Sequence, residues 1–157
     1  MSQAAKKPMA ASSLYEVDFY AWTQEQAMLL REKKWSQVDL VNVLEEIESL
    51  GRQQRQELRN RLGILLGHLL KWQFQPDHRS KSWRATIREQ RYRIHPLLDE
   101  NPSLKPHILE AIAYGYELGL ALVVQETPLD YGDLPENCLY LLEQILDDAF
   151  FLIKAVW

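Results

Sequence analysis

Apolar side chains recur every three or four residues along most of the chain, which is the spacing of helices that bury one face. The alternation of apolar and polar residues that marks a half-buried strand is nearly absent. The pattern therefore predicts an all-α fold, an irregular antiparallel bundle of five to six helices. The predicted helical segments are 18–34, 40–50, 52–74, 80–98, 104–125 and about 136–153.

Several helix starts are indicated by side chains that can accept hydrogen bonds from the free N–H groups of a first turn. Thr23 and Gln26 give a capping-box pattern in the first segment. The remaining N-cap candidates are Ser36 and Asp39 before the second segment, and Ser80 and Ser82 before the fourth.

Glycine and proline indicate where helices end. Gly51 allows a break or a kink between the second and third segments, and Pro76 ends the third. The pair His95-Pro96 is expected to kink or close the fourth segment. A turn at 101–103 and a loop at 127–135 precede the last two segments.

The widest apolar face predicts the centre of the core. It lies on the third segment and consists of leucines at helical spacing. The fifth segment adds Ala111, Gly115 and Gly119, a stripe of small residues suited to close contact between helices. The leucines are Leu58, Leu62, Leu65, Leu66, Leu69 and Leu70.

Length and composition place the chain among ordinary globular domains, with 157 residues, 46% apolar and 25% charged. We expect a disordered N-terminal tail over 1–13 and a single helical domain over 14–157. Cys138 is the single cysteine, so no internal disulfide can form and the bacterial cytosol is the expected compartment. We expect neither secretion nor a membrane span, because no apolar run approaches the length needed to cross a bilayer.

Charge is distributed unevenly behind a formal net charge of −4. Residues 1–50 carry a net charge of −3, residues 51–95 carry +8 and residues 96–157 carry −9. This division suits either a basic face for an anionic partner or a bundle whose own charges are complementary. We favour internal pairing, because an acidic segment that follows a basic one can neutralise it within the same chain.

Two amides and a histidine fall on or beside apolar faces. Gln73 and Gln90 each lie in the apolar arc of their helix, so both are expected to be buried and hydrogen-bonded. They indicate either a polar network that sets helix register or the wall of a ligand pocket. His68 lies at the border of the leucine face, where a histidine is more often a structural residue than a catalyst.

Arg84, Arg88 and Arg91 share one flank of the fourth segment and form an edge that could bind phosphate or carboxylate. Glu45 and Glu48 flank the apolar stripe of another segment. We therefore predict that one of these two carboxylates contacts one of the three arginines, which would close the edge within the chain.

Other chemistry has weaker support in the sequence. Glu45, Glu48 and His68 lack the Glu-x-x-His spacing of di-iron bundles, so we predict no metal and no cofactor. No nucleophile elbow or Gly-rich phosphate loop is present in the sequence. Trp72 and Trp83 lie among basic residues, as base-stacking side chains do, but the isoelectric point of 5.6 argues against a dedicated nucleic-acid binder.

The chain also resembles a known family, the uncharacterised bacterial, largely cyanobacterial, proteins of domain-of-unknown-function family number twenty-nine. This resemblance implies a compact α-helical fold with no assigned biochemical activity. It rests on Tyr15-Glu16-Val17-Asp18-Phe19-Tyr20-Ala21-Trp22, Glu45-Glu46-Ile47-Glu48-Ser49-Leu50-Gly51, His68-Leu69-Leu70-Lys71, Gln75-Pro76, Ser82-Trp83, Thr86-Ile87, Gln90-Arg91 and Pro102-Ser103-Leu104.

Our leading functional hypothesis is a protein-interaction module whose contact surface is the basic edge at 79–91. One alternative is a small-anion or phosphate-binding protein or enzyme that uses His68, Arg84, Arg88 and Arg91, and another is weak nucleic-acid association through the same edge. The candidate polar cluster comprises Glu45, Glu48, His68, Gln73, Trp83, Arg84, Arg88, Gln90 and Arg91.

We also expect a homodimer contact at the C-terminus, because apolar residues there surround more of a helix than one inward face can hide. A monomer that docks Trp157 back into the bundle is the alternative. The residues are Phe150, Phe151, Leu152, Ile153, Val156 and Trp157.

Overall fold

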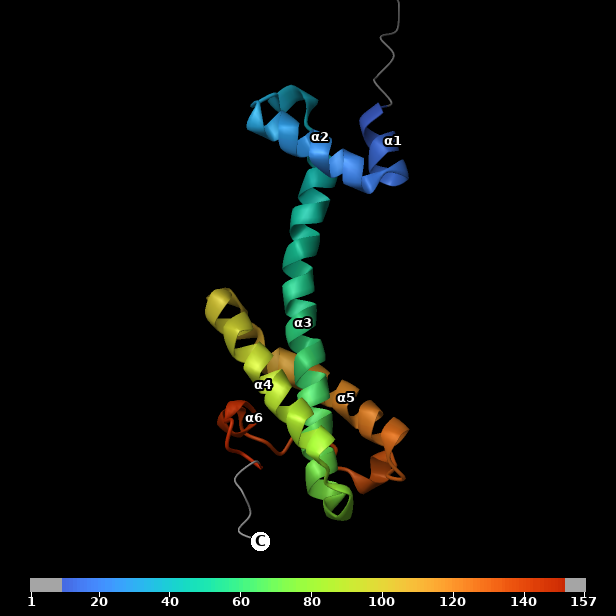
Figure 1. The fold of residues 1–157 in the computed structure, drawn as a ribbon, viewed down its shortest axis with the longest axis vertical. Helices are drawn as coiled ribbons and strands as arrows, with labels where there is room; N and C mark the ends of the chain where they lie inside the picture. Colours follow the sequence, from blue (N-terminus) through green and yellow to red (C-terminus); the bar gives the residue numbers. More distant parts are fainter. Residues whose placement is uncertain (1–9, 152–157) are drawn as a thin grey trace, which may run out of the picture. The chain divides into compact units, whose positions relative to one another are not determined.

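The computed structural model describes residues 10–151, with side chains from Leu14 onward, and these residues contain six α-helices and no strand. The all-α prediction is confirmed. Four short 3₁₀ turns lie between the helices, at Trp35–Gln37, Pro76–His78, Pro102–His107 and Tyr131–Asp133. The helices are α1 (Ala10–Val17), α2 (Phe19–Arg31), α3 (Leu40–Phe74), α4 (Lys81–Glu100), α5 (Ile108–Glu126) and α6 (Leu142–Leu146) (Figure 1).

By its internal contacts the chain falls into two compact units, Met1–Arg52 and Gln53–Trp157, whereas the sequence suggests one domain over 14–157. The two units are described separately. α1 begins at Ala10, so residues 10–13 of the predicted tail are helical, and residues 1–9 lie outside the described part of the chain.

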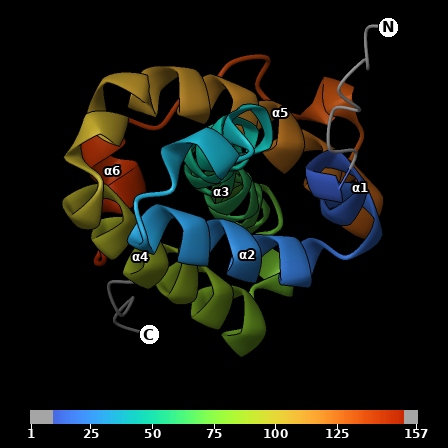
Figure 2. The ribbon, with the colours of Figure 1, turned by 90° about the horizontal axis from the view of Figure 1, so that it is seen from above.

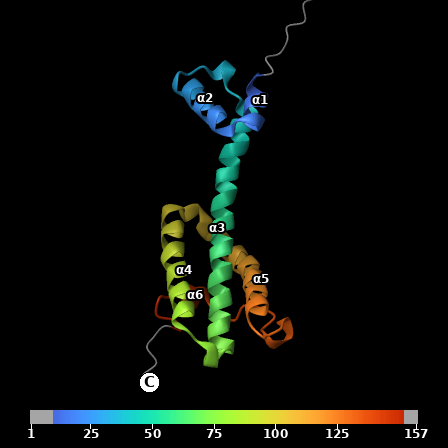
Figure 3. The same ribbon diagram turned by 45° about the vertical axis from the view of Figure 1, so that its right-hand side comes forward.

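The first unit contains α1, α2 and the first turns of α3 (Figure 3). Asp18 is the N-cap of α2, since its carboxylate accepts a hydrogen bond from the Ala21 N–H at 3.0 Å. The capping box predicted at Thr23 and Gln26 is wrong. Thr23 lies inside the helix, where its hydroxyl donates to the Tyr20 carbonyl at 2.7 Å.

Asp39 joins α2 to the start of α3. Its carboxylate accepts from the Trp22 indole N–H at 3.1 Å and from the Asn42 N–H at 3.4 Å, so the predicted cap at Asp39 is confirmed. The Asp39 N–H donates to the Gln26 side-chain oxygen at 2.8 Å. Trp22 and Gln26 are both buried, which makes this contact the polar centre of the unit.

Neither Gly51 nor Pro96 ends its helix. α3 continues through Gly51, and α4 continues through Pro96 to Glu100. Glycine permits a break without enforcing one. Proline removes one helical N–H and leaves the carbonyl four residues earlier, at Tyr92, without its helical donor. Tyr92 and Pro96 are both exposed, so solvent is available to that carbonyl.

In the second unit, α4 turns back beside α3 after Pro76, and α5 lies on another side of α3 (Figure 2). α3 ends at Phe74, as Pro76 predicted. The leucine face of α3 forms the core with residues from α4 and α5, and this part of the prediction is confirmed. The most buried members, which include Ile145 of α6, are Leu58, Leu62, Leu65, Leu66, Leu69, Leu70, Ile87, Ile94, Ala111, Val123 and Ile145.

Four glycines bring the backbones of α3 and α5 together. Gly115 and Gly119 on α5 face Gly63 and Gly67 on α3. A Cβ atom added at Gly119 would lie 2.8 Å from the Gly67 nitrogen, and one at Gly115 would lie 3.0 Å from the Gly63 nitrogen. The predicted small-residue stripe of α5 therefore does make a close helix contact, and its partner on α3 is a second pair of glycines four residues apart.

The C-terminal prediction needs correction. Instead of a helix over 136–153, the structure has the five-residue helix α6 at Leu142–Leu146. Asp147 and Asp148 follow it directly, and acidic side chains oppose the dipole at a helix C-terminus. Phe150 and Phe151 are half-buried and pack against the core, and residues 152–157 lie outside the described part of the chain.

The segment Pro102–Glu126 is long and apolar enough to cross a membrane by length and composition alone. The expectation that no apolar run approaches this length is therefore wrong. One such segment is weak evidence for a membrane span, because the core helix of a water-soluble protein passes the same criterion.

The glycine contact predicts opposite effects of the same substitution at two sites. Gly119→Ala should lower the free energy of unfolding by about 1–3 kcal/mol, because its new methyl group meets backbone that cannot move aside. Gly51→Ala is the control, since a Cβ there has no neighbour within 4 Å and should raise that free energy by about 0.5–1 kcal/mol through helix propensity. Urea unfolding of both variants tests this, and equal effects would contradict it.

Candidate functional site

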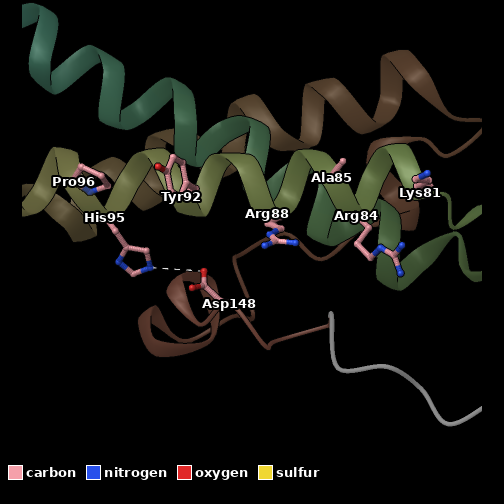
Figure 4. Close-up of a pocket in the computed structure, with 8 residues that line it drawn as sticks. All are labelled: Lys81, Arg84, Ala85, Arg88, Tyr92, His95, Pro96 and Asp148. Atoms are coloured by element: carbon pink, nitrogen blue, oxygen red, sulfur yellow. Dashed lines mark ion pairs between the residues drawn. The ribbon is translucent and has the colours of Figure 1, made fainter.

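A groove of about 800 Å³ runs along α4 in the second unit and is a candidate site. We call it the α4 groove. α4 supplies all but one of its described lining residues, and the segment after α6 supplies the other (Figure 4). The lining residues are Lys81, Arg84, Ala85, Arg88, Tyr92, His95, Pro96 and Asp148.

Helical spacing explains why these residues share one side. They recur every three or four positions from Lys81 to Pro96, which makes a stripe about 22 Å long on a helix that rises 1.5 Å per residue. Ser80 sets the start of the stripe, because its hydroxyl accepts from the Trp83 N–H at 3.1 Å and caps α4. The prediction of a cap at Ser80 is confirmed.

The groove is basic at one end. Lys81, Arg84 and Arg88 are exposed, and no ion pair within the described residues involves any of them. At the other end the His95 ring nitrogen Nε2 lies 4.0 Å from a carboxylate oxygen of Asp148. The cations are spread along the helix and do not meet at one point (Figure 4).

A smaller cavity of about 180 Å³ shares Lys81 and Arg84 with the groove. Its other lining residues include Trp72 and Arg79. The Arg79 guanidinium donates to the Trp72 carbonyl at 2.7 Å and lies 5.2 Å from the centre of the Trp72 ring. Arg79 is thereby held in place and extends the basic end of the groove beyond the first turn of α4.

Arg91 does not belong to the exposed arginine edge, so the prediction that it shares this edge with Arg84 and Arg88 is wrong. At 100° per residue it lies between the groove stripe and the core-facing stripe of Ile87 and Ile94. Its side chain is fully buried, with 0% exposure. The guanidinium donates to three backbone carbonyls, Ile145 at 2.8 Å, Phe150 at 2.9 Å and Gln144 at 3.1 Å.

This contact, which we call the carbonyl clamp, attaches the C-terminal segment to α4. His95, one turn after Arg91, adds a hydrogen bond between Nε2 and the Leu146 carbonyl at 3.0 Å. Burial lowers the pKa of Arg91, whereas the nearby carboxylates of Asp148 and Asp147 act in the opposite direction. The clamp satisfies carbonyls at the end of α6 and so helps to end that helix.

His68 lies within the leucine-rich part of α3 and outside the groove. Its ring nitrogen Nδ1 donates to the Ile64 carbonyl at 2.8 Å, which selects the tautomer with a proton on Nδ1. Burial lowers the pKa of His68, and the charge of Lys71 lowers it further. The Ile64 hydrogen bond and the charge of Glu126 raise it by less.

Lys71 is a buried cation that the sequence analysis missed. Its ammonium group forms an ion pair with Glu126, and it lies 5.3 Å from the centre of the Trp83 ring. These three residues connect α3, α4 and α5. Because the Trp83 ring lies against a lysine of its own chain, the hypothesis that it stacks on nucleic-acid bases is weaker. A lysine directly after Leu69 and Leu70 was the available signal in the sequence.

The two glutamines have different environments. Gln90 is buried and accepts a hydrogen bond from Arg61 at 3.4 Å, as the prediction required. Gln73 is exposed, and its side-chain oxygen accepts from the Tyr140 hydroxyl at 2.6 Å, so its predicted burial is wrong. Gln73 belongs to the last turn of α3, beyond the fully buried leucines, and the C-terminal segment reaches it there.

Glu45 and Glu48 belong to the first unit, where both form ion pairs with Arg52, at 2.7 Å and 3.9 Å. The predicted contact of one of them with Arg84, Arg88 or Arg91 is not among the ion pairs of the described residues, and Arg91 is buried against carbonyls of the C-terminal segment instead. In the described residues no group of three histidines, cysteines or carboxylates is placed to hold a metal ion. The candidate polar cluster thus separates into local contacts, and Arg84 and Arg88 remain in the groove.

The carbonyl clamp predicts that Arg91→Lys lowers the free energy of unfolding by about 2–3 kcal/mol, because one ammonium group cannot satisfy three separated carbonyls. The variant should speed hydrogen exchange of backbone amides more in α6 than in α3. Arg84→Ala, an exposed site on the same helix, should change stability by less than about 0.5 kcal/mol. Equal stability of the two variants in urea unfolding would contradict the clamp.

His68 predicts part of the pH dependence of stability. Because its pKa is lowered in the folded state, the unfolded chain binds the proton first as pH falls. The contribution of neutral His68 is complete above the unfolded pKa of about 6.5 and is lost as pH drops from there to the lower folded pKa. His68→Gln should show a shallower loss of stability between about pH 7.5 and 5 in urea titrations. A loss as steep as that of the native chain would contradict this role of His68.

Comparison with known proteins identifies a family for this chain, but the family has no assigned activity. Neither the curated proteins nor the solved structures include a match to this chain. One family does match, over residues 14–151, which is most of the chain and agrees with the resemblance drawn from its motifs. The chain belongs to the family described as Domain of unknown function DUF29.

Proposed function

We propose that this protein is a cytosolic interaction module that binds an acidic segment of a partner protein in the α4 groove. The observation that carries the proposal is the row of exposed cations at Lys81, Arg84 and Arg88, which no carboxylate of the described residues pairs. Exposed cations beside a groove attract an anionic partner and set its orientation.

The shape of the groove favours an extended ligand. A single phosphate bound at Arg84 could not also reach the far end of a stripe about 22 Å long. An extended peptide spans that distance with roughly seven residues at about 3.3 Å each. Ala85, Tyr92 and Pro96 provide apolar surface between the charged ends, which suits a segment with both acidic and apolar side chains.

The other functional hypotheses have less support. A small-anion site or enzyme that uses His68, Arg84, Arg88 and Arg91 needs these side chains to converge, yet His68 bonds the Ile64 carbonyl and Arg91 is buried in the clamp. Nucleic-acid association through 79–91 would draw on Trp72 and Trp83, whose rings already lie against Arg79 and Lys71.

Binding of a labelled peptide of alternating glutamate and leucine residues, followed by fluorescence anisotropy, tests the proposal. We expect micromolar affinity that weakens as salt is raised, because exposed charges are screened. The double variant Arg84→Ala with Arg88→Ala should bind at least about tenfold more weakly, because two charge contacts are removed. The control, Arg93→Ala with Lys105→Ala, removes the same charge at exposed positions outside the groove and should bind within about twofold of the native chain.

Three results would contradict the proposal. Loss of binding in both double variants would show a response to net charge alone. Tighter binding of single-stranded DNA than of the peptide would favour the nucleic-acid alternative. Saturable binding of inorganic phosphate that displaces the peptide and requires both arginines would favour a small-anion site.

A further inference from the structure

The α4 groove contains one carboxylate as well as its cations. Asp148, from the segment after α6, is the one acidic side chain among the described residues that line the groove. Arg84 and Arg88 project from α4 on the side where Asp148 lies (Figure 4). A ligand in the groove therefore meets both signs of charge, whereas the cations alone suggest a wholly acidic ligand.

Backbone contacts fix the position of Asp148. Arg91 donates to the carbonyls of Ile145 at 2.8 Å and Phe150 at 2.9 Å, which lie on either side of Asp148 in the sequence. The carbonyl clamp therefore holds this carboxylate beside α4 before any ligand binds. A charge that is already in place costs less to order on binding than a charge on a free segment.

The charge of Asp148 stays largely unpaired within the described residues. Its one ion pair there is with His95 at 4.0 Å, and the same ring nitrogen has a closer partner in the Leu146 carbonyl at 3.0 Å. The Asp148 side chain is 77% exposed. By contrast, the Asp147 carboxylate accepts from the Ala149 N–H at 2.9 Å and does not line the groove. Asp148 is thus the carboxylate that a ligand in the groove can reach.

We propose that the α4 groove binds a dipolar segment of a partner, whose acidic side chains contact Arg84 and Arg88 and whose lysine or arginine contacts Asp148. The inference rests on the proposed function of the groove and adds the charge pattern of its ligand. Asp148 acts as a specificity-determining residue, because it attracts a basic side chain and repels an acidic one at the same place. A wholly acidic segment is thereby disfavoured at this position, although most charges of the groove are positive.

Helix geometry sets the spacing of these charges. Arg84 and Arg88 are about 6 Å apart along the axis, which an extended peptide covers with about two residues. His95 lies about 10 Å beyond Arg88, and Asp148 lies beside His95. About three residues of an extended peptide therefore separate the second acidic side chain from the basic one. The expected pattern is two acidic residues with one residue between them and, about three residues further along, a lysine or arginine.

Peptide binding to the full chain, followed by fluorescence anisotropy, tests the inference. One peptide carries two glutamates and a lysine at this spacing, and a matched peptide has glutamine in place of the lysine. Both are made in the two chain directions. In one direction, the native chain should bind the lysine peptide at least about threefold more tightly than the glutamine peptide, which is the size of an exposed charge contact. Net charge alone predicts the opposite order, because the cations of the groove outnumber Asp148.

Substitutions at Asp148 should change this preference. Asp148→Asn should remove it, and Asp148→Lys should make the glutamine peptide bind more tightly than the lysine peptide. Asp148 is exposed, so both variants should keep the native circular dichroism. Asp147→Asn is the control and should keep the preference, since it removes the same charge one residue away and retains a side-chain oxygen for the Ala149 N–H.

Equal or weaker binding of the lysine peptide in both chain directions would overturn the inference. A preference that survives Asp148→Asn, or that Asp147→Asn also removes, would overturn it too, because Asp148 would not make the contact. If those results came with binding that still requires Arg84 and Arg88, the proposed function would stand without this charge pattern. Absence of binding by every peptide would reject the proposed function and the inference together.

Discussion

The second unit depends on the close contact between α3 and α5. Helices normally pack with their axes 8–10 Å apart, and side chains at the contact set that distance. Glycines at 63, 67, 115 and 119 remove those side chains, so that backbone meets backbone. The leucine face of α3 can then contact α4 and α5 at the same time, and the core forms around one central helix. Bulk at any of these four positions would separate the helices on which every other contact of the unit is built.

Buried cations complete this arrangement and decide which charges stay available. Lys71 is neutralised by Glu126, and Arg91 is satisfied by backbone carbonyls without any carboxylate. Arg91 therefore fixes the C-terminal segment to α4 through carbonyls, while Arg84 and Arg88 stay exposed on the same helix.

Local features of the fold could be predicted from the sequence, and features that depend on tertiary partners could not. The leucine face and the caps at Asp39 and Ser80 depend on neighbours within one or two turns, and they were predicted correctly. Arg91 was assigned to the exposed row because it lies only about 20° around the helix from Arg84 and about 60° from Arg88, and only the position of the C-terminal segment shows that it is buried. The role of Gly63 and Gly67 could not be predicted, because it depends on α5 packing against them.

The carbonyl clamp also couples the groove to a local folding equilibrium. Asp148 closes one end of the groove, and it is held there only while Arg91 and His95 retain the carbonyls of the preceding residues. Small segments held by few contacts open more often than the core. Each opening removes one groove wall, so a ligand that touches Asp148 shifts the population toward the closed segment, and a ligand that needs a wider groove selects the open one.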